Sequence, residues 1–118
     1  MTTFVLVPGA WQGGWVWRKV AGSLRELGHR VFTPTLTGLG ERAHLASLDV
    51  NLDTHIQDVI GLLETEELTD VMLVGHSYAG VVITGVADKA GQRLNGLVYV
   101  DAFVPENGFS LQANNPSR

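Results

Sequence analysis

The sequence predicts an α/β protein with three layers: a mostly parallel sheet of about four strands, with helices on both faces. Short β-branched and apolar runs alternate with longer segments whose apolar residues recur every three to four positions. The short runs are apolar on both faces, which is typical of strands buried in a parallel sheet. Right-handed crossovers between such strands place helices on both sides of the sheet. Strands are expected at 3–7, 30–32, 71–74 and 97–100, and helices at 15–27, from 52 to 63, and after the turn at 75–80 to near residue 91.

Composition limits the classes of function. A chain of 118 residues, 45% of them hydrophobic, suits one domain with a buried core. The net charge of −4 and the lack of a basic stripe argue against nucleic-acid binding. With no cysteine, disulfides and zinc–thiolate sites are excluded. The apolar runs are too short for a membrane span and the N-terminus lacks a secretion signal, so we expect a cytoplasmic protein. Residues 1–118 are expected to form one domain, with 106–118 as a loose tail.

A glycine-rich loop follows the first strand. It reads Gly-Ala-Trp-Gln-Gly-Gly-Trp over residues 9–15 and leaves backbone N–H groups at the carboxyl end of a strand, where α/β folds place their sites. The loop lacks the Gly-x-Gly-x-x-Gly and Gly-Lys-Ser/Thr patterns, so no nucleotide cofactor is expected. The N–H of Ala10 is a candidate donor in an oxyanion hole; the alternative is a plain turn. Trp11 is expected near a pocket.

Turn and cap residues delimit the helices. Gly28 is a natural stop for the first helix, whose apolar residues recur every three to four positions. These residues are Val16, Val20, Leu24 and Leu27. Asn51 or Asp53 is expected to cap the second helix, and Thr54 with Gln57 has the spacing of a capping box.

The segment 35–50 is polar and irregular, and loops of this length are usually functional or mobile. His44 lies within it and is more typical of a surface residue than of a ligand. His55 and Asp58 lie beside the apolar stripe of the second helix, and we expect both to be solvated. No histidine or carboxylate spacing typical of a metal site is present.

Residues 71–80 read Val-Met-Leu-Val-Gly-His-Ser-Tyr-Ala-Gly. A strand that ends at Gly-His-Ser and passes at once into a helix predicts a sharp turn with Ser77 at its apex. Such a turn needs small residues two before and two after the serine, and Gly75 and Ala79 meet that demand. The turn directs the Tyr78 N–H toward the place where an oxyanion would form. The alternative is a serine in an ordinary loop.

Four motifs in this order resemble the α/β-hydrolase fold. The nearest branch comprises bacterial esterase-like proteins related to plant methyl-salicylate esterases and hydroxynitrile lyases. The motifs are Phe-Val-Leu-Val-Pro-Gly-Ala-Trp with Gly-Gly-Trp-Val-Trp (4–17), Leu-Thr-Gly-Leu-Gly (36–40), Gly-His-Ser-Tyr-Ala-Gly (75–80) and Tyr-Val-Asp-Ala-Phe-Val-Pro (99–105). The resemblance implies that Ser77 is the nucleophile and that the N–H groups of Ala10 and Tyr78 form the oxyanion hole. It also implies that Trp11 and Gln12 border the substrate pocket.

The chain departs from this family in length. Members are about twice as long, and their catalytic acid and histidine lie on later strands, so the sequence resembles the N-terminal half. No histidine follows His76. His76 should point away from the serine hydroxyl at such a turn. His44 is the best of the remaining candidates for a base, and Asp101 follows a strand after which a few α/β-hydrolases carry their acid.

Three functions therefore stay open. The first is a serine hydrolase that cleaves small carboxylic esters through an acyl-enzyme on Ser77, weakened by the missing base. The second is a catalytically silent scaffold or oligomerisation module. The third is a hydroxynitrile lyase, although Ala10 in place of threonine favours an esterase. No cofactor, nucleic-acid or membrane partner is expected. The apolar edge Leu97–Val100 would be open, which predicts a homodimer or higher oligomer that covers it.

Overall fold

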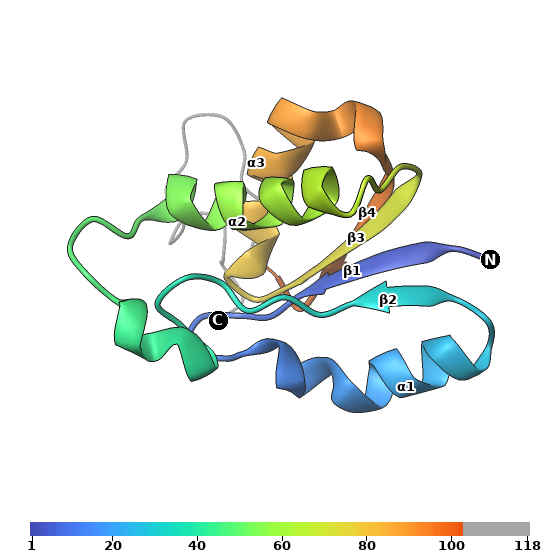
Figure 1. The fold of residues 1–118 in the computed structure, drawn as a ribbon, viewed down its shortest axis with the longest axis horizontal. Coiled ribbons are helices and arrows are strands. Elements are labelled where there is room, and N and C mark those ends of the chain that lie inside the picture. The colour runs from blue at the N-terminus through green and yellow to red at the C-terminus, as the bar shows by residue number, and fades with distance from the viewer. Residues whose placement is uncertain (103–118) are drawn as a thin grey trace.

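The computed structural model describes residues 1–102, which are organised around a four-stranded sheet (Figure 1). The strand order is β2-β1-β3-β4, and every pairing is parallel. The strands are β1 (Thr3–Val7), β2 (Arg30–Phe32), β3 (Val71–His76) and β4 (Leu94–Val100). The predicted parallel sheet is confirmed, and β4 begins before the expected residue 97. The tail predicted at 106–118 lies outside the described residues.

Helices cover both faces of the sheet, as predicted. Helix α1 (Arg18–Glu26) lies on one face, whereas α2 (Leu52–Thr65) and α3 (Ala79–Ala90) lie on the other (Figure 1). A 3-10 helix, Gly14–Trp17, leads into α1. Among the helices of residues 1–102, none has both the length and the apolar character that a membrane span requires.

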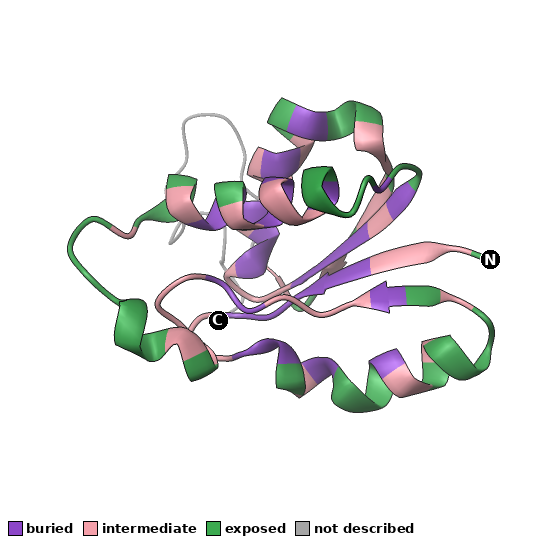
Figure 2. Cartoon of the chain, viewed as in Figure 1, coloured by how far each residue is buried: buried purple, intermediate pink, exposed green. Residues whose placement is uncertain are grey.

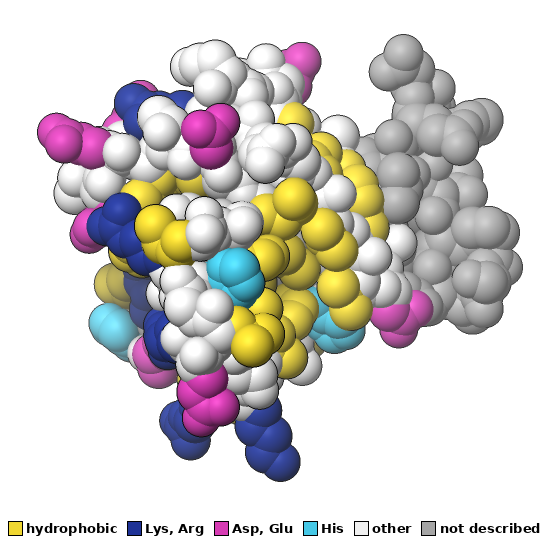
Figure 3. All heavy atoms as spheres, turned by 90° about the vertical axis from the view of Figure 1, so that its right-hand side faces the viewer, with side chains coloured by type: hydrophobic (Ala, Val, Ile, Leu, Met, Phe, Trp, Pro, Cys, Tyr) yellow, Lys and Arg dark blue, Asp and Glu magenta, His cyan; other side chains and the backbone are white. Residues whose placement is uncertain are grey.

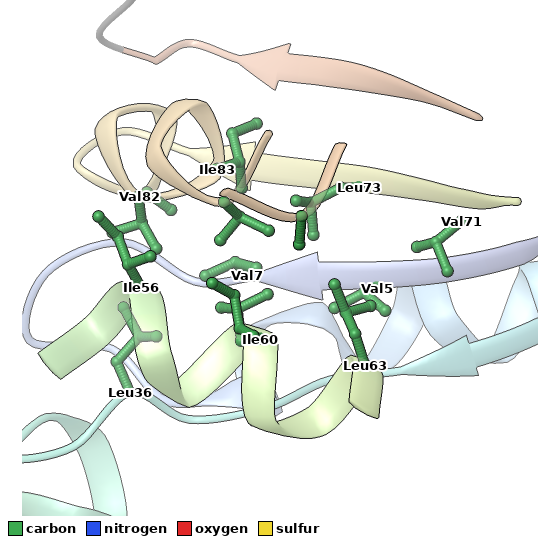
Figure 4. Packing of buried hydrophobic residues seen from close by; sticks show 14 of the residues in the cluster. Val5, Val7, Leu36, Ile56, Ile60, Leu63, Val71, Leu73, Val82 and Ile83 are labelled. Carbon is green, nitrogen blue, oxygen red and sulfur yellow. The ribbon is translucent and has the colours of Figure 1, made fainter. Parts of the chain in front are cut away.

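The core follows the alternation of side chains along the strands. Successive residues of a strand point to opposite faces, so Val5, Val7 and Leu73 face α2 and α3, whereas Leu6 and Val74 belong to a smaller cluster with α1. Figure 4 shows the larger cluster, in which residues of α2 and α3 meet those of β1 and β3. Buried residues lie along the central strands and the inner sides of the helices, with exposed residues outside (Figure 2).

The predicted apolar stripe of the first helix is buried in part: Val16 and Leu24 pack against the smaller cluster, whereas Val20 and Leu27 do not. Trp17 and Ala21 are buried against the sheet, whereas Val20 is 45% exposed and Leu27 is 75% exposed. The 3-10 helix before α1 has three residues per turn, so a stripe counted from Val16 at α-helical spacing leaves the buried face. Leu27 lies just beyond the last residue of the helix.

The predicted helix ends are confirmed in part. Gly28 follows α1 with φ of 90°, a conformation that glycine adopts without steric cost. Asn51 caps α2: its side chain accepts a hydrogen bond from the Thr54 N–H at 3.1 Å, and the Thr54 hydroxyl accepts one from the Asn51 N–H at 3.1 Å. The predicted box of Thr54 with Gln57 is wrong, because α2 begins at Leu52 and Thr54 is already the inner partner of the Asn51 cap.

The connections create a switch point between β1 and β3. After β1 the chain passes through α1 to β2 on one side, and β3 then pairs with the other side of β1. Ligands of open α/β sheets bind outside the carboxyl ends of the strands at such a point. The loop after β1 and the turn after β3 carry the residues that the sequence singles out.

Candidate active site

Ser77 occupies a tight turn between β3 and α3. Its φ of 56° is in the left-handed region, which residues other than glycine seldom adopt. The Ser77 N–H donates to the carbonyl of Val100 at 3.3 Å, and the Gly80 N–H donates to the carbonyl of Ser77 at 3.0 Å. The predicted sharp corner is therefore present, and hydrogen bonds on both sides hold it in place.

The small residues around Ser77 are required by contact. A Cβ atom at Gly75 would lie 2.8 Å from the carbonyl oxygen of Ala79 and 3.0 Å from its carbonyl carbon. These are backbone atoms, which cannot swing away as the end of a side chain can. Ala79 is itself fully buried. The turn thus closes only with glycine at position 75.

The loop after β1 forms the opposite wall of a cavity over Ser77. This cavity has a volume of about 380 Å³. All five residues predicted for the site line it, namely Ala10, Trp11, Gln12, Ser77 and Tyr78, together with Gly9 and His76. Trp11 has a φ of 69° and is 85% exposed, so its indole stands at the rim rather than in the core.

Two backbone amides at this cavity are available as donors. Within residues 1–102, neither the N–H of Ala10 nor that of Tyr78 donates a hydrogen bond to another group of the chain. Tyr78 is the residue before the first turn of α3, whose N-terminus carries a partial positive charge. Such an arrangement can stabilise negative charge that develops on an oxygen.

Hydrogen bonds connect the glycine-rich loop to Thr35 and, through Thr35, to Glu41. The Gly14 N–H donates to the Thr35 hydroxyl at 2.8 Å, and that hydroxyl donates to Glu41 at 2.7 Å. The hydrogen bond from Thr35 is the main cause that lowers the pKa of Glu41 below its usual value. Arg42 donates to the carbonyl of Thr35 at 2.8 Å. Thr35, in the loop after β2, therefore links the loop after β1 to the segment 40–45.

The candidate bases are dispersed. His44 is exposed in the 3-10 helix Gly40–Leu45 and does not line the cavity. His29 accepts a hydrogen bond from the Thr2 N–H at 3.0 Å, at the opposite edge of the sheet. His76 lines the cavity, but its ring packs edge-on against Trp17 with centroids 6.4 Å apart. Asp101 directly follows β4 and is exposed.

The prediction that His55 and Asp58 are solvated is wrong. His55 is only 7% exposed and bonds with both ring nitrogens, to the Tyr78 hydroxyl and to the Thr37 carbonyl, each at 2.9 Å. Asp58 accepts from the N–H and the hydroxyl of Thr37. The sequence held a signal for this: His55 is four residues before the buried Val59, so the two share one helix face.

The described residues contain no group of three histidine, cysteine, aspartate or glutamate side chains that could hold a metal ion. The polar groups at the cavity include the hydroxyl of Ser77, the amides of Ala10 and Tyr78, and the side chain of Gln12. The Gln12 Oε1 atom is buried and has no hydrogen-bond partner within the described part of the chain.

The described residues form a parallel sheet with helices on both faces, and Ser77 lies in a left-handed turn at the switch point of this sheet. These features are typical of an α/β protein with a hydrolase-type turn. The profile of the alpha/beta hydrolase family matches residues 4–118. The chain belongs to this family.

Individual proteins with similar sequences or structures are consistent with this family assignment. The chain is 61% identical over 116 residues to the carbendazim hydrolyzing esterase of Nocardioides sp. (strain SG-4G), covering 98% of this chain and 48% of the relative. It is 35% identical over 109 residues to methylesterase 2 of Arabidopsis thaliana, covering 91% and 41%. The structure of an extracellular alpha/beta-hydrolase from a Paenibacillus species matches with a TM-score of 0.84 at 31% identity, covering 98% and 49%. The chain thus spans about half the length of the relatives it matches.

Proposed function

We propose that this chain carries the nucleophile and the oxyanion hole of a serine hydrolase that cleaves small carboxylic esters. The observation that carries the proposal is Ser77, held at a φ of 56° on a cavity that Ala10 also lines. A serine hydroxyl on a strained turn, beside amides that donate to no group within residues 1–102, is suited to attack a carbonyl carbon and to stabilise the oxyanion.

The reaction has two halves. In the first, the Ser77 oxygen bonds to the ester carbonyl carbon while a base takes its proton, and the N–H groups of Ala10 and Tyr78 bind the oxyanion. The bond to the alcohol oxygen then breaks, and the alcohol leaves with the proton. In the second half, water attacks the acyl carbon and Ser77 regains its hydrogen as the acid departs.

The general base that Ser77 needs is not identified within residues 1–102. We propose that it comes from outside residues 1–102, because three of the four histidines lie away from the cavity or bond elsewhere and His76 packs on Trp17. Serine hydrolases that have lost part of their triad retain roughly 10³–10⁴-fold acceleration over water from the oxyanion hole and binding. Without that base the chain should therefore be a weak esterase.

The cavity favours a small substrate. Its volume of about 380 Å³ is near the lower end of ligand pockets, which run from about 300 to 1,000 Å³. Trp11 supplies an aromatic side chain at the rim, and Gln12 lines the cavity with a polar side chain whose Oε1 has no hydrogen-bond partner within residues 1–102. The names of the relatives point to esters, and we propose methyl esters and carbendazim itself as the first substrates to test.

A fluorophosphonate probe tests the proposal directly. Incubation of the chain followed by peptide mass spectrometry should place the phosphonyl group on Ser77. Ser23 and Ser47 are exposed and serve as internal controls that should stay unmodified. Equal modification of all three serines would contradict an activated Ser77. No modification of Ser77 would favour a silent scaffold.

We also propose that the chain self-associates through β4. Within the described residues β4 pairs only with β3, and Val98 and Val100 are each 39% exposed. Figure 3 shows hydrophobic side chains gathered in a band on the side of the molecule seen at the right of Figure 1. An open apolar edge strand is a template for pairing with another strand.

Sedimentation at micromolar concentration should therefore give a dimer or larger species. A Val98→Lys variant, which places a charge on the edge strand, should shift the mass to that of a monomer. A monomeric mass for the unmodified chain would contradict the proposal.

A further inference from the structure

His55 joins two parts of the molecule that are far apart in sequence. It lies on α2, is 7% exposed, and uses both ring nitrogens. Its Nδ1 atom is 2.9 Å from the hydroxyl of Tyr78, the residue directly after Ser77. Its Nε2 atom is 2.9 Å from the carbonyl oxygen of Thr37, in the long loop between β2 and α2.

These partners determine where the proton lies on the ring. A carbonyl oxygen can only accept, so Nε2 must carry the hydrogen that it shares with Thr37. A neutral ring has one N–H, and Nδ1 is then an acceptor for the hydroxyl hydrogen of Tyr78. Burial raises the pKa of Tyr78, which keeps this hydroxyl protonated and able to donate.

Asp58 holds the same loop residue from the next turn of α2. Its two carboxylate oxygens accept from the N–H of Thr37 at 2.7 Å and from its hydroxyl at 2.8 Å. Thr37 is therefore bound by its N–H, its hydroxyl and its carbonyl to a single helix. The loop is fixed at this residue although it has no regular structure there.

The fixed loop borders a second cavity beside the first. This cavity has a volume of about 300 Å³. Its lining includes Thr37, His55 and Trp11. Trp11 lines both cavities, so the position of the loop bears on the rim of the site over Ser77.

We propose that His55 is a positioning residue whose imidazole ties the Thr37 loop to Tyr78 and so sets the second cavity and the nucleophile turn as one unit. The link runs from the Thr37 carbonyl through Nε2–H and Nδ1 to the Tyr78 hydroxyl. The consequence for Ser77 reactivity rests on the proposed function, whereas the tautomer and the tethering of the loop do not.

Two substitutions each remove one of the two hydrogen bonds that His55 makes. Asparagine places its side-chain oxygen near the position of Nδ1, so His55→Asn can still accept from Tyr78 but cannot reach Thr37. Glutamine is longer, so His55→Gln can still donate to Thr37 but no longer has the Nδ1 acceptor. Gln57→Asn, at an exposed position on the same helix, is the matched control.

The experiment combines ¹⁵N NMR of the imidazole, amide hydrogen exchange and the rate of Ser77 modification by the fluorophosphonate. In the unmodified chain at neutral pH, His55 should show a protonated Nε2 and an unprotonated Nδ1. Loop amides around residues 37–40 should exchange at least tenfold faster in His55→Asn than in His55→Gln, while amides of β3 and α3 keep their protection. Both variants should be modified at Ser77 about tenfold more slowly, and Gln57→Asn should match the unmodified chain.

The outcomes separate the two proposals. A ring with its hydrogen on Nδ1, or equal loop exchange in the Asn and Gln variants, would overturn the role of His55 whether or not Ser77 reacts. An unreactive Ser77 in the unmodified chain would count against the proposed function alone, since the NMR and exchange measurements would still decide the link.

Discussion

A Ser77→Gly variant should be more stable than a Ser77→Ala variant by about 1 kcal/mol, while both lose all modification by the fluorophosphonate and all ester turnover that depends on Ser77. Residue 77 has a φ of 56°, a conformation that costs a residue with a Cβ atom about 1–2 kcal/mol and costs glycine almost nothing. Alanine keeps the Cβ atom and the strain but removes the hydroxyl.

Urea unfolding of both variants measures the first effect, and p-nitrophenyl acetate turnover with probe modification measures the second. Glycine frees the unfolded chain as well, which offsets part of the gain, so the comparison is made with alanine and not with the native serine. Turnover by Ser77→Ala equal to that of the unmodified chain would rule out a Ser77 mechanism. Lower stability of Ser77→Gly than of Ser77→Ala would show that the turn is not strained.

The second large effect concerns the closure of the same turn. A Gly75→Ala substitution should reduce the free energy of unfolding by about 2–3 kcal/mol, because the added Cβ atom meets the backbone of Ala79 at 2.8 Å and the turn must open. Opening the turn also moves Ser77 away from the Ala10 side of the cavity, so probe modification should fall together with stability.

Gly61→Ala is the matched control. Gly61 lies within α2, and a Cβ atom there would meet nothing within 4 Å. The same glycine-to-alanine change should therefore stabilise the chain by about 1 kcal/mol, because alanine is the better helix former. Opposite signs in urea unfolding are expected for the two variants. A loss at position 61 similar to that at position 75 would contradict the steric argument.

The parts of the fold that depend on local sequence could be predicted. The central strands β1 and β3 contain apolar runs, and the turn at Ser77 is specified by the small residues Gly75 and Ala79 within the same short stretch. The meeting of the loop after β1 with Ser77 followed from a general rule of parallel sheets, because neighbouring strands bring their carboxyl ends to one edge. The catalytic roles of Ala10 and Tyr78 stay predictions.

Features that depend on distant partners were missed. His55 reads as a polar residue at the margin of an apolar stripe, and its partners, Thr37 and Tyr78, precede and follow it by many positions. The spacing of His55 and Val59 indicates that His55 is buried, but neither spacing nor propensity indicates its two hydrogen-bond partners. The exposure of Val20 was missed for a different reason, since a short 3-10 helix changes the phase of the helix that follows it.

The strand order has a consequence for how the chain folds. The segment between β1 and β2 is shorter than that between β1 and β3, so we expect β1 and β2 to pair first, whereas Val5 meets its neighbour Leu73 later. Contacts between distant segments require a large loop to close and slow the folding of a domain. During synthesis, one side of β1 therefore stays unpaired until β3 has left the ribosome. The two walls around Ser77 come together only at that late step.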